Sequence, residues 1–166
     1  MAMLPRGTYR LHPESTTVHF SDRKFGLFTI RGTMRLAEGS ITIADPITRS
    51  SVRAVLTADT FTTPMAKRDD HVRSEKLLDV ARFPTIEFRG ERAAESPSGW
   101  TVLGTLTVHG QQQDCTLAID EITERDGTVH VTARARVDRN DFGVTGMKVA
   151  AGPYVDIRIH AMASRA

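Results

Sequence analysis

The feature that most limits how this chain can fold is an alternation of apolar and polar residues with a period of two. In residues 28–36, apolar side chains or glycine occupy every second position, and Thr or Arg fills the positions between them. The pattern returns in four later segments, at residues 52–58, 100–108, 129–137 and 155–161. Such alternation is typical of strands with one buried and one solvated face. It argues against a parallel sheet covered on both sides, whose strands would be apolar throughout.

Turn-forming residues separate the alternating segments and favour an antiparallel arrangement. They occur at residues 38–40, 45–46, 95–99, 109–110 and 126–127. Many strands joined by short connections predict an all-β sandwich or barrel, and 166 residues suit a single domain. One stretch departs from the pattern: Thr63 as cap and Pro64 at the first helical position predict a short helix over residues 65–73, and Ser74 begins a further turn.

The predicted inner faces mix large residues with very small ones. Gly32, Ala54, Ala58, Gly104, Ala133 and Ala135 fall on the same sides as the bulky apolar residues. An eight-stranded barrel is just wide enough to be filled by side chains or to hold one small ligand. Small inward residues favour an apolar cavity, whereas close packing by neighbouring large residues is the alternative.

The composition is that of an ordinary globular protein. Hydrophobic residues make up 40% of the chain and charged residues 25%, and 22 basic against 20 acidic residues leave a formal net charge of +2. Because this excess is small and spread along the sequence, we expect a surface of mixed charge and no nucleic-acid partner. The first seven residues lack the apolar segment of a signal peptide, and no apolar run could span a membrane, which predicts a cytoplasmic protein. A single cysteine, Cys115, excludes an internal disulfide.

Catalytic and metal-binding motifs are missing. The sequence has no nucleophile elbow, P-loop, dinucleotide-binding glycine motif or H-E-x-x-H zinc motif, so we expect neither a metal nor a cofactor. Asp69 and His71 could do acid–base work if they lined a pocket. The alternatives are a solvated helix face with local ion pairs and a polar rim that contacts the head group of a ligand.

Four segments stand in a characteristic order and spacing. They are YRLHPESTTVHF at residues 9–20, KRDDHVRS at 67–74 running on to RFPTIEF at 82–88, GTLTVHG at 104–110, and RNDFGV at 139–144. On these segments the chain resembles the YceI-like family of lipocalin-like polyisoprenoid-binding proteins over nearly its whole length. The chain departs from the family pattern in two places: the family commonly has His-Ser where this chain has Ser15-Thr16, and His where it has Lys24. The resemblance therefore extends to the apolar pocket more securely than to the head-group site.

The resemblance implies an elongated eight-stranded antiparallel lipocalin-like β-barrel, with a short helical insertion around residues 64–79 and a single domain over residues 1–166. It implies an isoprenoid-tailed or fatty-acyl lipid along the barrel axis, and it is compatible with a homodimer. We predict that seven apolar residues line the barrel: Phe28, Ile30, Phe61, Leu78, Phe88, Val102 and Phe142. We predict a polar mouth formed by Arg68, Asp69, His71, Arg139 and Asp141. For Arg139 and Asp141, bracing the helical insertion is an equally good alternative.

The leading hypothesis is a protein that binds, stores or transports a long apolar lipid without chemistry. The ligand would be of polyisoprenoid, isoprenoid-quinone or fatty-acyl type. One alternative is an enzyme that acts on an apolar substrate through Asp69 and His71. Another is a stress-related interaction protein whose cavity is incidental.

Overall fold

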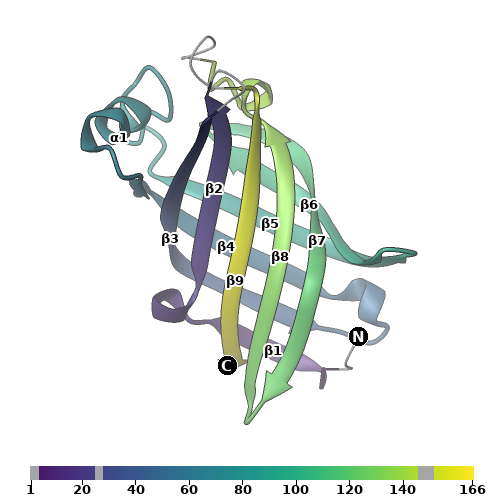
Figure 1. Cartoon of the computed structure of the whole chain (residues 1–166). Helices are drawn as coiled ribbons and strands as arrows, with labels where there is room; N and C mark the ends of the chain where they lie inside the picture. The colour runs from purple at the N-terminus through teal and green to yellow at the C-terminus, as the bar shows by residue number, and fades with distance from the viewer. Residues whose placement is uncertain (1–3, 25–27, 146–151) are drawn as a thin grey trace.

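Strands make up most of the molecule (Figure 1). The computed structural model describes residues 4–24, 28–145 and 152–166, without the side chains of Lys24 and Phe28. The strands in this part of the chain are β1 Gly7–Leu11, β2 Thr17–Lys24, β3 Phe28–Ile43, β4 Ser51–Thr62, β5 Thr85–Ser96, β6 Gly99–Val108, β7 Gln111–Arg125, β8 Thr128–Asp138 and β9 Tyr154–Arg165. The helical elements are α1 Ala66–Arg73 and the 3-10 turns η1 Pro13–Ser15, η2 Ile47–Arg49 and η3 Arg139–Phe142.

The strands close into an antiparallel barrel of eight strand positions. Each strand from β2 to β9 pairs with the next along the chain, and β9 pairs back with β2, for example at Phe20 and Ile157. The short strand β1 continues the position of β2 toward the chain termini, where it pairs with β3 on one side and β9 on the other. The prediction of an eight-stranded antiparallel barrel is therefore confirmed.

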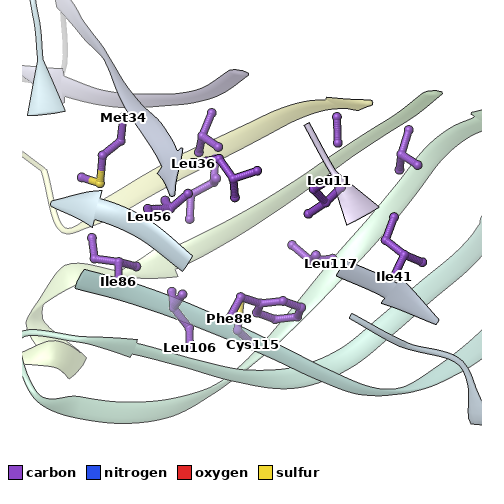
Figure 2. Close-up of a cluster of buried hydrophobic side chains, with 14 of the residues drawn as sticks. Leu11, Met34, Leu36, Ile41, Leu56, Ile86, Phe88, Leu106, Cys115 and Leu117 are labelled. Atoms are coloured by element: carbon purple, nitrogen blue, oxygen red, sulfur yellow. The ribbon is translucent and has the colours of Figure 1, made fainter. Parts of the chain in front are cut away.

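Alternation along the strands decides which side chains face the interior. On β8, Val129, Val131 and Ala133 are buried, whereas the intervening His130 and the following Arg134 are exposed. The inward side chains of the strands meet in one apolar cluster, and Figure 2 shows part of it, with residues from several strands directed to the same interior. Burial of this surface is the main favourable contribution to folding.

Gly104 does not leave space in the interior, contrary to the sequence-based interpretation. It pairs with Gly90 across β5 and β6, and a Cβ atom placed on it would lie 2.0 Å from the Arg89 carbonyl oxygen. The two backbones approach too closely for any side chain. Glycine is therefore required at this position by a strand contact next to a register shift in β5.

The helical insertion lies at the end of the barrel opposite the chain termini (Figure 1). Its helix begins at Ala66, and Met65 occupies the cap position without a side-chain cap bond. The prediction of Thr63 as helix cap was therefore wrong, because the Thr63 hydroxyl and backbone N–H both donate to the Asp69 carboxylate. Ser74 caps the following turn as predicted, because its Oγ accepts the backbone N–H of Lys76, and its hydroxyl also donates to the His71 carbonyl oxygen.

Candidate functional site

An apolar cavity of about 290 Å³ lies inside the barrel. Inward side chains of β2 to β9 form its wall, and the small residues Gly32, Ala54, Ala133 and Ala135 are among them. Six of the seven residues predicted to line the barrel border this cavity: Ile30, Phe61, Leu78, Phe88, Val102 and Phe142. The seventh prediction, the side chain of Phe28, lies outside the described residues.

The barrel is plugged near the chain termini. Tyr9 and Ala163, from the paired strands β1 and β9, are 2% and 0% exposed, and neither borders the cavity. The Tyr9 hydroxyl donates to the Pro5 carbonyl oxygen at 2.7 Å, which fixes the ring in this plug. At the opposite end, Val72 of α1 and Leu77 of the next turn face the cavity. A tail inside the barrel would therefore end at the plug and leave at the α1 end.

Polar side chains border the cavity almost entirely at the α1 end. In the described part of the chain they are Ser21 and Asp22 on β2, Arg68 on α1, Arg139 on η3, and Thr16 farther down the barrel. The Thr16 hydroxyl accepts the backbone N–H of Met162, so it belongs to the barrel wall. The remaining polar groups give the site one polar end and a long apolar interior.

Asp22 and Arg139 face each other at this polar end, with 3.9 Å between carboxylate oxygen and guanidinium nitrogen. Their side chains are only 14% and 11% exposed. Burial raises the pKa of the Asp22 carboxyl above its usual value, and the Arg23 backbone N–H and the Arg139 charge act in the opposite direction. Arg139 also donates to the carbonyl oxygens of Gly152 and Val144. The pair thus places two charged groups beside an apolar chamber.

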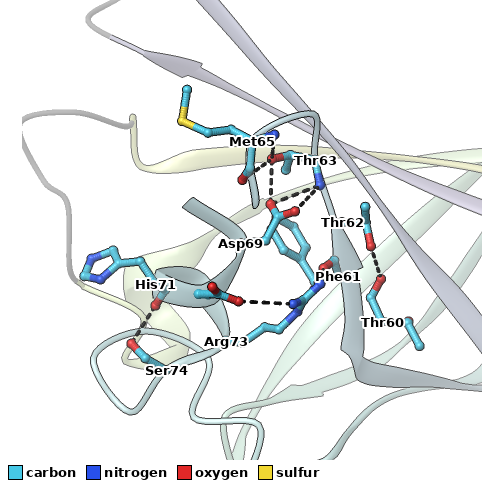
Figure 3. Close-up of polar contacts among 10 residues, drawn as sticks. Thr60, Phe61, Thr62, Thr63, Met65, Asp69, His71, Arg73 and Ser74 are labelled. Carbon is cyan, nitrogen blue, oxygen red and sulfur yellow. Dashed lines mark hydrogen bonds and ion pairs between the residues drawn. The ribbon is translucent and has the colours of Figure 1, made fainter. Parts of the chain in front are cut away.

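Arg68 reaches the cavity from α1 because a buried threonine holds it. Thr63 accepts hydrogen bonds from the Arg68 Nε and Nη2 atoms at 3.3 and 3.0 Å, and its own hydroxyl donates to Asp69 at 2.6 Å. Both carboxylate oxygens of Asp69 also accept the Thr63 backbone N–H (Figure 3). Asp69 is 3% exposed and does not border the cavity, so in this structure it anchors α1 to the end of β4.

The other residues predicted for the mouth lie off the cavity. The His71 ring points away from Asp69 (Figure 3) and is half-buried, and the Asp141 residue is exposed. The backbone carbonyl of Asp141 accepts a hydrogen bond from Gln113. Of the five residues predicted for the mouth, the structure therefore brings Arg68 and Arg139 together at the cavity. Arg139 braces the segment around Gly152 and Val144 as well as facing Asp22.

His109 connects three of the sequence segments that carry the family resemblance. Its ring packs edge-on against Phe83 with centroids 4.8 Å apart, and its Nδ1 lies 3.3 Å from the Phe142 carbonyl oxygen. The turn after β6 places this residue, half-buried, between η3 and the end of the helical insertion. These contacts help to fix the wall residue Phe142 beside the cavity.

Sequence reasoning missed Asp22, the cavity's acidic group. A signal was present, because Asp22 continues the inward phase of β2 after Val18 and Phe20. A charge on the buried phase of a strand is unusual unless it is paired. Cys115 was noted only as a single thiol. It is buried in the cavity wall, where burial raises the pKa of its thiol.

No group of three or more metal-binding side chains that could hold an ion occurs among the described residues. Within the same ranges, no helix is long and apolar enough to cross a bilayer.

Comparison with known sequences agrees with this architecture. A family model described as a YceI-like domain matches residues 9–163. A UPF0312 protein of Vibrio cholerae is 26% identical over 155 residues, which cover 87% of this chain and 79% of that protein. A UPF0312 protein of Yersinia enterocolitica is 29% identical over 101 residues, which cover 60% of this chain and 53% of that protein.

Solved structures share the fold at low sequence identity. BcnA of Burkholderia cenocepacia superposes with a TM-score of 0.84 at 15% identity, covering 93% of this chain and 99% of that one. A polyisoprenoid binding domain from Saccharophagus degradans superposes with a TM-score of 0.72 at 14% identity, covering 95% and 98%. At such identities the likeness concerns the fold.

Proposed function

This chain belongs to the YceI-like family, and we propose that it binds one apolar lipid tail inside the barrel, with the lipid head group at the α1 end and without chemical change. The observation that carries the proposal is the cavity, which is apolar along its length, plugged at one end and polar at the other. The likeness in fold to a polyisoprenoid binding domain supports a ligand of the same chemical kind.

The cavity volume limits how much of a tail the barrel can enclose. An apolar cavity of about 150 Å³ holds one benzene molecule, so a cavity of about 290 Å³ has room for roughly twelve carbon atoms. That corresponds to two or three isoprene units or to a medium-length acyl chain. A longer tail would extend through the α1 end or widen the barrel.

Hydrophobic burial alone would not select the ligand. A lipid starts in a membrane or another carrier and not in water. Its transfer into the barrel therefore gains much less free energy than the ~0.8 kcal/mol per methylene for transfer from water to an apolar environment. The net affinity then depends on the fit of the tail and on a few contacts with the head group. Asp22, Arg68 and Arg139 are the groups positioned to supply those contacts.

Arg68 is the side chain best prepared for a head group. A guanidinium has five N–H donors. In Arg68, one donor on Nε and one on Nη2 are directed at Thr63 Oγ1. The remaining donors have no partner among the described residues. They would suit a carboxylate, a phosphate or the carbonyl of a quinone ring.

The geometry gives less support to the enzyme alternative. The Asp69 carboxylate accepts hydrogen bonds from Thr63 and does not border the cavity, so it does not face a substrate held there. Storage, transport, a cytoplasmic location and a homodimer stay predictions.

Replacing Val102 with Asp tests the proposal. A carboxylate in the apolar wall should abolish retention of a fatty acid or isoprenoid, since an unpaired buried charge is very costly beside an apolar tail. The matched control is Thr101→Asp on the same strand, because Thr101 does not border the cavity. Circular dichroism should show an intact barrel in both variants. Full lipid retention by Val102→Asp would contradict the assignment of the cavity.

A further inference from the structure

Arginines gather on one wall of the barrel although the chain carries a net charge of only +2. Seven exposed arginines lie on β2, β3, β8 and β9, strands on the side facing the viewer in Figure 1; apart from Arg165 at the C-terminal end of β9, they share one surface. We call this surface the arginine wall; it consists of Arg23, Arg31, Arg35, Arg134, Arg136 and Arg158. Most of these arginines border one hollow on the outer surface of the barrel.

The strand register brings like charges together on this wall. Arg158 on β9 lies directly opposite Arg134 on β8 in one row of the sheet. Directly opposed like charges destabilise a sheet, so this row costs stability that an anionic partner would offset. Asp156 lies among the arginines and pairs with Arg136 at 2.8 Å.

Acidic partners on the wall are too few to neutralise it. Arg134 pairs with Asp120, and Arg136 pairs with Asp156. The hydrogen bond from Arg136 and its charge, followed by the nearby charge of Arg158, lower the pKa of the Asp156 carboxyl below its usual value. Within the described ranges, Arg31, Arg35 and Arg158 form no ion pair.

The opposite wall is balanced. On β4 and β5, Arg53 and Arg89 both pair with Glu87, and Arg53 also pairs with Glu38 on the neighbouring strand β3. The excess of positive charge therefore lies on one side of the barrel. This uneven distribution of charge would orient the molecule toward a negatively charged surface.

Two exposed apolar side chains add to this asymmetry at the α1 end. Met65, next to α1, is 51% exposed, and Tyr154, at the start of β9, is 56% exposed. Among the described residues, these two are the large hydrophobic side chains exposed to solvent. Arg136 of the arginine wall lies over the Tyr154 ring, 5.8 Å from its centroid. Tyrosine beside arginine suits the boundary between lipid head groups and acyl chains.

We propose that the arginine wall and the rim at the α1 end dock on the surface of an anionic lipid bilayer, with Met65 and Tyr154 in its interfacial layer. The inference rests on the proposed function, because a lipid-binding barrel must exchange its ligand with a membrane. Positive charge on one wall complements anionic head groups. Docking through the rim would place the open, polar end of the cavity at the membrane, from which the ligand comes.

Vesicle sedimentation tests the docking surface. The wild-type protein should partition onto vesicles of an equimolar mixture of phosphatidylglycerol and phosphatidylcholine more strongly than onto phosphatidylcholine alone, and added salt should weaken the binding. The double variant Arg31→Gln/Arg158→Gln should lose about 25-fold in the partition coefficient, about fivefold (roughly 1 kcal/mol) for each arginine.

The matched control is Arg89→Gln/Arg92→Gln, which removes the same charge from exposed positions on β5. It should keep nearly wild-type partition. Equal partition onto both vesicle types, or an equal loss in the control, would overturn the proposal. Preference for a double-stranded DNA fragment over the anionic vesicles would overturn it in favour of a nucleic-acid partner.

Uptake of a fatty acid dissolved in buffer, measured on the same proteins, separates this inference from the proposed function. The Arg31→Gln/Arg158→Gln variant should take up the fatty acid as the wild type does, because neither arginine borders the cavity. Uptake reports on the cavity and vesicle partition reports on the arginine wall, so a failure of one is distinguished from a failure of the other.

Discussion

Replacing Ala133 on β8 with Phe places a phenyl ring where the structure has empty space. Ala133 is 5% exposed and borders the cavity. The substitution adds six ring carbons, and one benzene occupies an apolar cavity of about 150 Å³, so the ring would fill about half of the 290 Å³. Room for about twelve carbons of a tail would fall to about six.

The loss of six buried methylenes sets the expected change in affinity. At ~0.8 kcal/mol each, a saturated fatty acid with a twelve-carbon chain would lose up to about 5 kcal/mol when it binds from water, which is more than 1,000-fold in Kd. Isothermal titration with saturated fatty acids of increasing length measures this. The chain length beyond which affinity stops rising should fall by about six carbons.

Thermal unfolding of the same variant shows whether the ring fills an existing cavity or is forced into a close-packed interior. A ring that enters a real cavity should leave Tm unchanged or raise it, whereas inserting it into a close-packed interior would cost about 1–3 kcal/mol. Ala37→Phe, at an exposed position on β3, is the matched control and should bind like the wild type. The reasoning would be refuted if Ala133→Phe kept the wild-type dependence on chain length while remaining folded.

Three further outcomes follow from the polar groups. Asp69→Ala should lower the free energy of unfolding by about 2–3 kcal/mol in a urea titration, because it leaves the Thr63 donors unpaired; an unchanged free energy of unfolding would contradict its anchoring role. Arg68→Met should weaken binding of a fatty acid about tenfold but not of its methyl ester, by titration; equal effects on both ligands would rule out a head-group role. For Asp22 the raised pKa means that the folded state holds the proton more tightly. Stability relative to Asp22→Asn should therefore fall as pH rises from below the unfolded pKa through the folded one, and a rise with pH in the same denaturation series would contradict the burial argument.

The fold could be predicted from the sequence because its signals are local. Alternation within residues 129–137 and 155–161 identifies the inward side chains of β8 and β9, and the predicted turns at residues 109–110 and 126–127 join adjacent strands, whereas residues 38–40, also predicted as a turn, continue β3. Two features depend on pairing between distant segments and carry no such signal. These are the sharing of one barrel position by β1 and β2, and the close approach of β5 and β6 at Gly104.

The candidate site was predicted in part for the same reason. Apolar lining residues follow from strand phase, so Ile30 and Val102 could be identified before the structure. The polar groups depend on the rotation of a short helix, which directs Arg68 to the cavity and the adjacent Asp69 to Thr63. Surface charge that appears scattered along the sequence is collected by register, as Arg134 and Arg158 illustrate.

Native mass spectrometry of the purified protein, followed by solvent extraction and analysis of the extract, tests the binding of a lipid in the barrel most directly. We expect one lipid per chain, with an apolar tail, and its complete loss in Val102→Asp. A wild-type protein that carries no lipid, and that also takes up no isoprenoid quinone or fatty acid when these are supplied, would contradict the proposed function.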